Sequence, residues 1–383
     1  MISKENYPQG FWEVYDRRFT NKYEALLYAK EINGVVNFKF FDNIWDNFNR
    51  ELLGKKTLSE LYRQRAQQLR DKYDYLILYF SGGSDSYNVL RSYIDNGIKL
   101  DEICVKWCTR VIDSDIYTPN TSDTTAYNYL SEWDYAIKPV LDEIKISNPE
   151  IKITIVNWLD DRLENDPDII FNMVNHWHDI EVPSLATWSP SELQLVNQNK
   201  TVGSIYGVDK PCIFFKEKEA CMYFTDACTT MGPSNPCNVG GVEFFYWSPD
   251  MPELAFEMAY QSTIAFLKDP ELFKVKFNQS AVGTPAYREF YQLQQKKLRY
   301  ILYNNWTDRF QTQKPQALDR SDKHSWIHRC DEVSGYKDVY YQTMQKYLKK
   351  LNKNMFFENN GLAMYKSIAT KGFVILKLPL TSS

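Results

Sequence analysis

The clearest pattern in the sequence is a continuous apolar run that ends in a glycine turn. Residues 75–80 read YLILYF, and every one of them is apolar or aromatic. The turn SGGSDS follows, and apolar residues then recur with helical spacing at Val89, Leu90, Tyr93 and Ile94. A short apolar run bounded by glycine is typical of a strand that is buried on both faces, as in a parallel sheet. The pattern therefore predicts a strand, a tight turn and a helix.

Two further strands are predicted after this helix. Alternating apolar positions at Ile103, Val105 and Trp107 predict a strand over 100–107, and the segment IKITIVNW predicts another over 151–158. Gly97 is placed to end the first helix, and a helical pattern covers about 126–147 between the two strands. Strands that alternate with helices predict an α/β fold, a parallel sheet with flanking helices and right-handed crossovers. Ligands bind at the carboxyl ends of such strands, so the loops after 80, 107 and 158 should face one cleft.

The segments on either side divide the chain further. An amphipathic pattern over 57–73, with Thr57 and Glu60 spaced as a capping box, predicts a helix that leads into the first strand. We expect three regions: an N-terminal extension (1–56), the α/β domain (57–240) and a mainly helical C-terminal domain (241–383). The outlying elements that the patterns predict are a helix near 23–29, a strand at 35–40, a glycine-rich loop at 203–211, a strand at 212–215, helices near 253–266, 287–303 and 339–351, and a strand at 373–378.

Composition narrows the class of protein. The chain has 383 residues, 44% hydrophobic and 25% charged, as in globular proteins with more than one core. A net charge of −4 gives no global attraction to nucleic acid, although a local basic patch could still bind RNA. Seven cysteines without an N-terminal apolar segment favour reduced thiols, and no run approaches the roughly 18 apolar residues of a membrane span. We expect a cytoplasmic protein with no membrane partner; the Asn-, Lys- and Tyr-rich composition suits an AT-rich genome, and for a viral protein the compartment would be the host cytoplasm.

The glycine turn carries the candidate chemistry. Gly82 and Gly83 lack a Cβ, so the backbone can turn its N–H groups toward one point at the start of a helix, where anions bind. The turn lacks the Lys-Ser/Thr pair of a Walker A loop and the G-x-G-x-x-G spacing of a dinucleotide-binding turn. Residues 81–86 do resemble the SGGxDS signature of the PP-loop ATP pyrophosphatases, also called adenine nucleotide α-hydrolases. The resemblance covers the motif and the strand and helix pattern around it, about 75–158.

This resemblance implies an adenine nucleotide α-hydrolase-like (HUP-type) fold and a reaction. Members split ATP to AMP and pyrophosphate and adenylate a carbonyl or carboxylate, here for C–N bond formation on an acceptor such as a nucleobase or small metabolite. It also implies that the motif binds pyrophosphate, that Asp85 is the partner of Mg²⁺, and that the catalytic set includes Ser81, Asp85 and Ser86. The implied ATP-binding residues are Phe80, Ser81, Gly82, Gly83, Ser84, Asp85, Ser86 and, beside the adenine, Val105, Lys106 and Trp107.

Lys210 is a further candidate from the residues themselves. It follows a glycine-rich segment, from which it could reach the β and γ phosphates as a point charge. A solvated turn lysine is an equally good interpretation. The sequence alone does not separate the two.

Several alternatives stay open or lose support. Ser84 stands where many synthetases carry Leu and many sulfur-metabolism relatives carry Lys, so it assigns no subfamily. A sulfur-transfer or sulfonucleotide enzyme resembling the phosphoadenylylsulfate reductases is one alternative, although their Cys-Gly-Leu-His element is missing because Asn360 precedes Gly361-Leu362. A nucleotide-binding module without turnover is another. No C-x₂-C pair occurs, so zinc is not favoured. The cysteines considered for it are Cys212, Cys221, Cys228 and Cys237.

Overall fold

The structure is a computed structural model that describes most of the predicted α/β region and parts of both flanks. No helix in the part of the chain that the structure describes is long and apolar enough to cross a lipid bilayer. The loops expected after residues 107 and 158 and the helix near 339–351 lie outside the described residues, as does most of the helix near 287–303. The described residues are 10–20, 22–107, 133–157, 189–208, 210–216, 218–226, 241–269, 297–303, 306 and 368–378.

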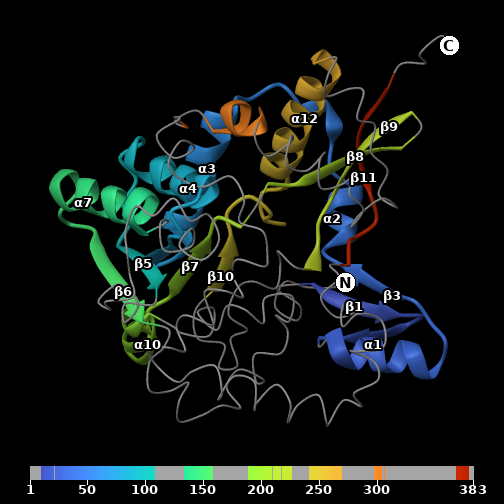
Figure 1. Ribbon diagram of the computed structural model, residues 1–383, viewed down its shortest axis with the longest axis horizontal. Helices are drawn as coiled ribbons and strands as arrows, with labels where there is room; N and C mark the ends of the chain where they lie inside the picture. The colour runs from blue at the N-terminus through green and yellow to red at the C-terminus, as the bar shows by residue number, and fades with distance from the viewer. Residues whose placement is uncertain are drawn as a thin grey trace, which may run out of the picture.

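A five-stranded parallel sheet forms the centre of the molecule (Figure 1). Its order is β10-β7-β4-β5-β6, with every neighbouring pair parallel. The α/β prediction is thus confirmed at the level of a parallel sheet with flanking helices. The chain enters at the central strand, moves outward through β5 and β6, and returns on the other side through β7 and β10. The strands are β4 (Tyr75–Tyr79), β5 (Glu102–Trp107), β6 (Lys152–Asn157), β7 (Val202–Tyr206) and β10 (Gly241–Phe244).

β7 corrects the prediction of a glycine-rich loop at 203–211. Residues 202–206 form a strand that is buried at every position and pairs with β4, while the loop begins only at Gly207. The glycine in this strand has a packing reason, because a Cβ added to Gly203 would lie 2.6 Å from the ring of Tyr73. The same ring blocks a Cβ at Gly241 in the neighbouring β10. Small residues therefore mark the place where an aromatic side chain packs on the sheet.

Helices cover both faces of the sheet, with α3 and α4 on one side and α10 on the other (Figure 1). Thr57 caps α3 (Leu58–Lys72) in a capping box with Glu60, as predicted. α4 (Ser84–Ile94) is followed by Gly97, whose φ of +62° permits a Schellman motif in which Ile98 N–H donates to the Tyr93 carbonyl at 2.9 Å. The remaining helices here are a π-helical turn (Trp133–Ile137), α7 (Lys138–Ser147) and α10 (Pro190–Asn197).

The N-terminal residues pack against segments from the C-terminal half. Trp45 is fully buried, and its ring centroid lies 4.7 Å from that of Phe224. The indole N–H of Trp12 donates to Asp226 Oδ2 at 2.9 Å. Two antiparallel sheets meet here: β2-β1-β3 and β11-β9-β8. Their strands and the nearby helices are β1 (Phe11–Val14), β2 (Arg17–Phe19), β3 (Val36–Lys39), β8 (Cys212–Lys216), β9 (Glu219–Tyr223), β11 (Phe373–Lys377), α1 (Lys22–Glu31), α2 (Asp42–Asp46) and a 3-10 turn (Arg50–Leu52).

The described residues after 240 include strands as well as helices, and the first of these strands belongs to the parallel sheet. β10 begins at Gly241 and pairs with β7, so the parallel sheet continues past the boundary that the sequence suggested. The helix expected near 253–266 is α12 (Pro252–Lys268), and a helical segment also covers 297–302. The predicted C-terminal strand is β11, which pairs with β9.

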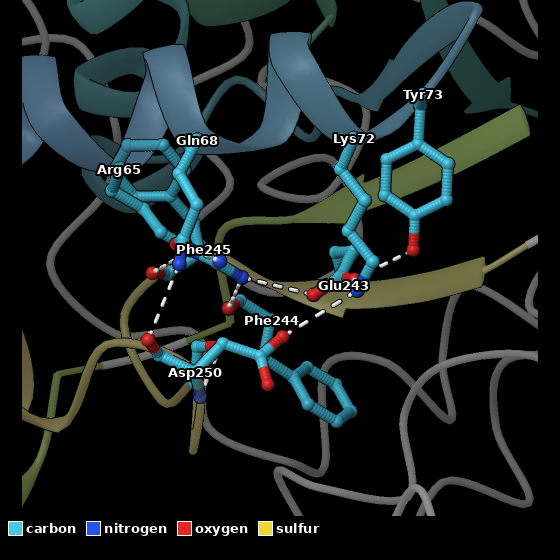
Figure 2. A network of polar contacts seen from close by, with 9 residues as sticks. Arg65, Gln68, Lys72, Tyr73, Glu243, Phe244, Phe245 and Asp250 are labelled. Atoms are coloured by element: carbon cyan, nitrogen blue, oxygen red, sulfur yellow. Dashed lines mark hydrogen bonds and ion pairs between the residues drawn. The ribbon is translucent and has the colours of Figure 1, made fainter. Parts of the chain in front are cut away.

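A buried ion pair joins α3 to β10 at the edge of the sheet (Figure 2). The Arg65 side chain is 0% exposed and its Nη2 lies 2.9 Å from Oε2 of Glu243, which is 2% exposed. Lys72 Nζ and the Tyr73 hydroxyl donate to the other carboxylate oxygen at 2.7 and 2.6 Å. Arg65 also donates to the carbonyl of Phe244 at 3.1 Å. Because every charge in the pair has partners, it positions the edge strand without an unpaired buried charge.

Candidate functional site

The SGGSDS segment lies where the strand order of the sheet reverses. It leaves the carboxyl end of β4, between β5 on one side and β7 on the other. Phe80 N–H donates to the Cys104 carbonyl at 2.9 Å, which ties the segment to β5. On the β7 side, a Cβ added to Gly207 would lie 3.0 Å from backbone atoms of Asp85 and Ser86. In open parallel sheets this reversal point, outside the carboxyl ends of the strands, is the usual ligand site.

The two glycines of the segment have different conformations and different structural roles. Gly82 has a φ of +73°, and a Cβ there would lie 2.7 Å from Ile137 Cγ1. Gly83 is the N-cap of α4, with extended dihedral angles and no side chain that caps the helix among the described residues. An N-terminal turn without a side-chain cap leaves N–H groups for another acceptor.

The serines of the motif hold the turn from inside. Ser81 and Ser86 hydroxyl oxygens lie 3.2 Å apart, and the Ser86 hydroxyl donates to the Gly83 carbonyl at 3.1 Å. The Ser86 side chain is 3% exposed, whereas Ser81 is exposed. The structure therefore shows Ser86 bracing the turn, and of the two hydroxyls only that of Ser81 is open to solvent.

Asp85 is the meeting point of residues from distant parts of the chain. Lys210 Nζ lies 3.1 Å from Asp85 Oδ1, and the lysine side chain is only 4% exposed, which excludes the solvated-lysine interpretation. The Tyr303 hydroxyl donates to the same Oδ1. The Tyr246 hydroxyl donates to the main-chain oxygen of Asp85 at 2.8 Å and accepts from Asn88 Nδ2 at 3.0 Å. Asp85 itself stays 24% exposed, so the carboxylate remains open to a ligand.

The tyrosines around Asp85 are fixed as neutral hydrogen-bond donors. Burial raises the pKa of Tyr303 well above its ordinary value, and the charge of Asp85 raises it further. Burial also raises the pKa of Tyr246, with the neighbouring Tyr62 and Asp85 adding to it. Both hydroxyls therefore keep their protons across the physiological pH range.

The expected adenine side is described only in part. Phe80 and Val105 are buried, at 3% and 0% exposure, so both contribute backbone and core packing at this edge. Lys106 and Trp107 end β5 beside the motif strand, and their side chains lie outside the described part of the structure. The structure thus brings 81–86, Val105 and Lys210 to one edge of the sheet.

Cysteine and metal chemistry adds no second site within the described residues. No group of three or more His, Cys, Asp or Glu side chains placed to hold a metal occurs among them. Cys212 and Cys221 lie on β8 and β9 but are not opposite each other, because Cys212 faces Tyr223. Burial raises the pKa of Cys221 to about 11, which disfavours the thiolate that sulfur transfer needs. Cys228 and Cys237 lie outside the described residues.

Sequence reasoning missed Tyr246 and Tyr303. Tyr246 follows the edge strand β10, and Tyr303 follows the helical segment 297–302. Neither belongs to a local motif; only the high content of 27 tyrosines pointed to aromatic residues around a pocket.

Comparisons with protein-family models, curated proteins and solved structures give no match. The candidate function therefore rests on the motif and on the geometry around it.

Proposed function

We propose that this chain has an adenine nucleotide α-hydrolase-like (HUP-type) core that binds ATP at 81–86 and splits it to AMP and pyrophosphate. One observation supports this most strongly: Lys210, which is 4% exposed, pairs with Asp85 in the first turn of α4, and no side chain among the described residues caps that turn at the reversal point of the sheet. A buried ammonium beside a helix N-terminus is suited to a polyphosphate, because the lysine contributes positive charge and the helix contributes N–H donors.

Magnesium fits the same residues. Both contacts described for the Asp85 carboxylate are made by Oδ1, and the group is partly exposed. Mg²⁺ takes oxygen ligands and keeps several waters, so one carboxylate with phosphate oxygens is a suitable donor set. Asp85 would hold the ion, which supplies charge neutralisation on the phosphates when bound.

The residues of the chain would act by positioning and charge rather than as nucleophiles. The oxygen of an acceptor carbonyl or carboxylate attacks the α-phosphorus, the bond from that phosphorus to the bridging oxygen breaks, and pyrophosphate leaves. An amine or ammonia then displaces AMP from the adenylate, which forms the C–N bond. In this proposal the amides after Gly82 and the Lys210 ammonium stabilise the charge that moves onto pyrophosphate.

Pyrophosphate release from ATP and Mg²⁺, with candidate acceptors supplied as a small-molecule cell extract, tests the proposal. Lys210→Ala should abolish release, whereas Lys216→Ala, which removes an exposed lysine from the end of β8, should leave it unchanged. Asp85→Asn should also abolish release while keeping an acceptor oxygen for Tyr303, so that the fold is retained. ATP binding without release would support the nucleotide-binding module instead, and no binding by the folded wild type would end the proposal.

A further inference from the structure

We infer that Tyr246 and Tyr303 form a clamp, called here the tyrosine clamp, that positions Asp85 and through it Lys210 for the nucleotide. The inference rests on the proposed function, and it assigns a role at the site to two residues that follow Asp85 by more than 150 positions. The two tyrosines hold different parts of one residue. Together they fix both its main chain and its carboxylate.

Tyr303 sets the direction of the carboxylate. Its hydroxyl and Lys210 Nζ both contact Asp85 Oδ1, and the ammonium also lies 5.6 Å from the centroid of the Tyr303 ring. The lysine is therefore held by a carboxylate on one side and by the face of an aromatic ring on the other. Since Tyr303 is 2% exposed, its ring and hydroxyl have little room to take another position.

Tyr246 fixes the backbone under that carboxylate. Its hydroxyl donates to the Asp85 main-chain oxygen, and its ring centroid lies 6.0 Å from that of Tyr303. The chain just before Tyr303 is held in turn, because the Tyr62 hydroxyl donates to the Leu302 carbonyl at 2.7 Å. The clamp is thus attached to α3 on one side and to the first turn of α4 on the other.

The clamp has a consequence for anion binding. A carboxylate in the first turn of a helix is attracted to the unpaired N–H groups of that turn. With Oδ1 held by Lys210 and Tyr303, the carboxylate is directed toward the lysine, and the amides remain for phosphate oxygens. Loss of the Tyr303 hydroxyl should let Asp85 turn toward the helix N-terminus and loosen Lys210.

Two measurements on Tyr303→Phe test the clamp, and one of them needs no nucleotide. Acetylation of Lys210 by an N-hydroxysuccinimide ester, followed by peptide mass spectrometry, should become roughly tenfold faster, because a hydrogen bond to a charged group is lost. For ATP-dependent pyrophosphate release, kcat/KM should fall by a similar factor, mainly through KM. Tyr300→Phe, on the same helical segment but 48% exposed, is the matched control and should change neither value.

The outcomes separate the clamp from the proposed function. Faster Lys210 acetylation in Tyr303→Phe supports the clamp even if the wild type splits no ATP, in which case only the proposed function fails. Unchanged acetylation together with unchanged kcat/KM would overturn the clamp and leave the proposed function standing. Should Tyr303→Phe not fold, as judged by circular dichroism, Tyr246→Phe removes the bond to the Asp85 main chain and gives the same comparison.

Discussion

Gly82→Ala should destabilise the fold, whereas Gly83→Ala, the same addition of one methyl group at the next residue, should not. Gly82 has a φ of +73° and would place a Cβ 2.7 Å from Ile137 Cγ1 and 3.1 Å from Ala136 Cβ. Gly83 has a φ of −77°, and a Cβ there would meet only the Ser81 hydroxyl at 3.4 Å. The two adjacent glycines therefore form a matched pair that differs in conformation and space.

The expected magnitudes follow from these differences. For Gly82→Ala, the left-handed backbone costs about 1–2 kcal/mol and the contact with buried Ile137 about 1–3 kcal/mol, so unfolding should become easier by roughly 2–5 kcal/mol. For Gly83→Ala, the loss of freedom in the unfolded chain stabilises by about 0.4–1 kcal/mol. A weaker N-cap offsets much of that gain, so the net change should stay within about 1 kcal/mol of zero.

Urea unfolding followed by circular dichroism measures both variants against the wild type. The midpoint should fall clearly for Gly82→Ala with little change in slope, because the surface exposed on unfolding is the same. Isothermal titration calorimetry should show that Gly82→Ala binds ATP more weakly than the wild type does. A Gly82→Ala protein as stable as Gly83→Ala would refute the assigned conformation of the turn.

Three other predictions test the scaffold around the site. Glu243→Gln should lower the free energy of unfolding by about 3–5 kcal/mol, because Arg65 would keep a buried charge without its carboxylate, and a urea midpoint equal to that of the wild type would contradict the buried pair. Cys221 in native protein should react with iodoacetamide far more slowly at pH 8.5 than in urea, since its pKa is raised to about 11, and equal rates by peptide mass spectrometry would refute this. Burial raises the pKa of Asp101, but hydrogen bonds from Lys99 and Arg70 outweigh this and lower it. A carboxyl with a lowered folded-state pKa stabilises above its unfolded pKa of about 3.9, so the stability gap between wild type and Asp101→Asn should be constant above about pH 5 and shrink on acidification below it.

The elements that could be predicted are those whose signals are local. The capping box of Thr57, the apolar run of β4 and the Gly97 ending of α4 each lie within a few residues, and the structure has all of them. The motif itself was also visible, because its glycines, serines and aspartate are consecutive. Local patterns of this kind therefore predict where β4 ends and where the helix after it begins.

The elements that could not be predicted depend on distant contacts. β7 contains Gly203 and Ser204, which disfavour a strand by propensity, yet the strand forms because Tyr73 packs on the glycine and Glu192 accepts a hydrogen bond from the serine at 2.7 Å. Tertiary packing overrides local preference here. The same holds for Lys210, whose burial follows from its ion pair and not from the sequence around it.

The position of the site in the chain explains why the motif alone says little about function. Lys210, Tyr246 and Tyr303 are 125, 161 and 218 positions from Asp85 in the sequence. They follow β7, β10 and the helical segment 297–302, all of which come after the point where the strand order reverses. A site of this kind is complete only when both sides of the sheet and the segment around Tyr303 have folded together. Since 81–86 supply amides that would suit many phosphate compounds, the choice among them depends on the later residues. In the proposed function, the acceptor specificity should therefore be sought in the chain beyond β7, which supplies the Lys210, Tyr246 and Tyr303 side chains that contact Asp85.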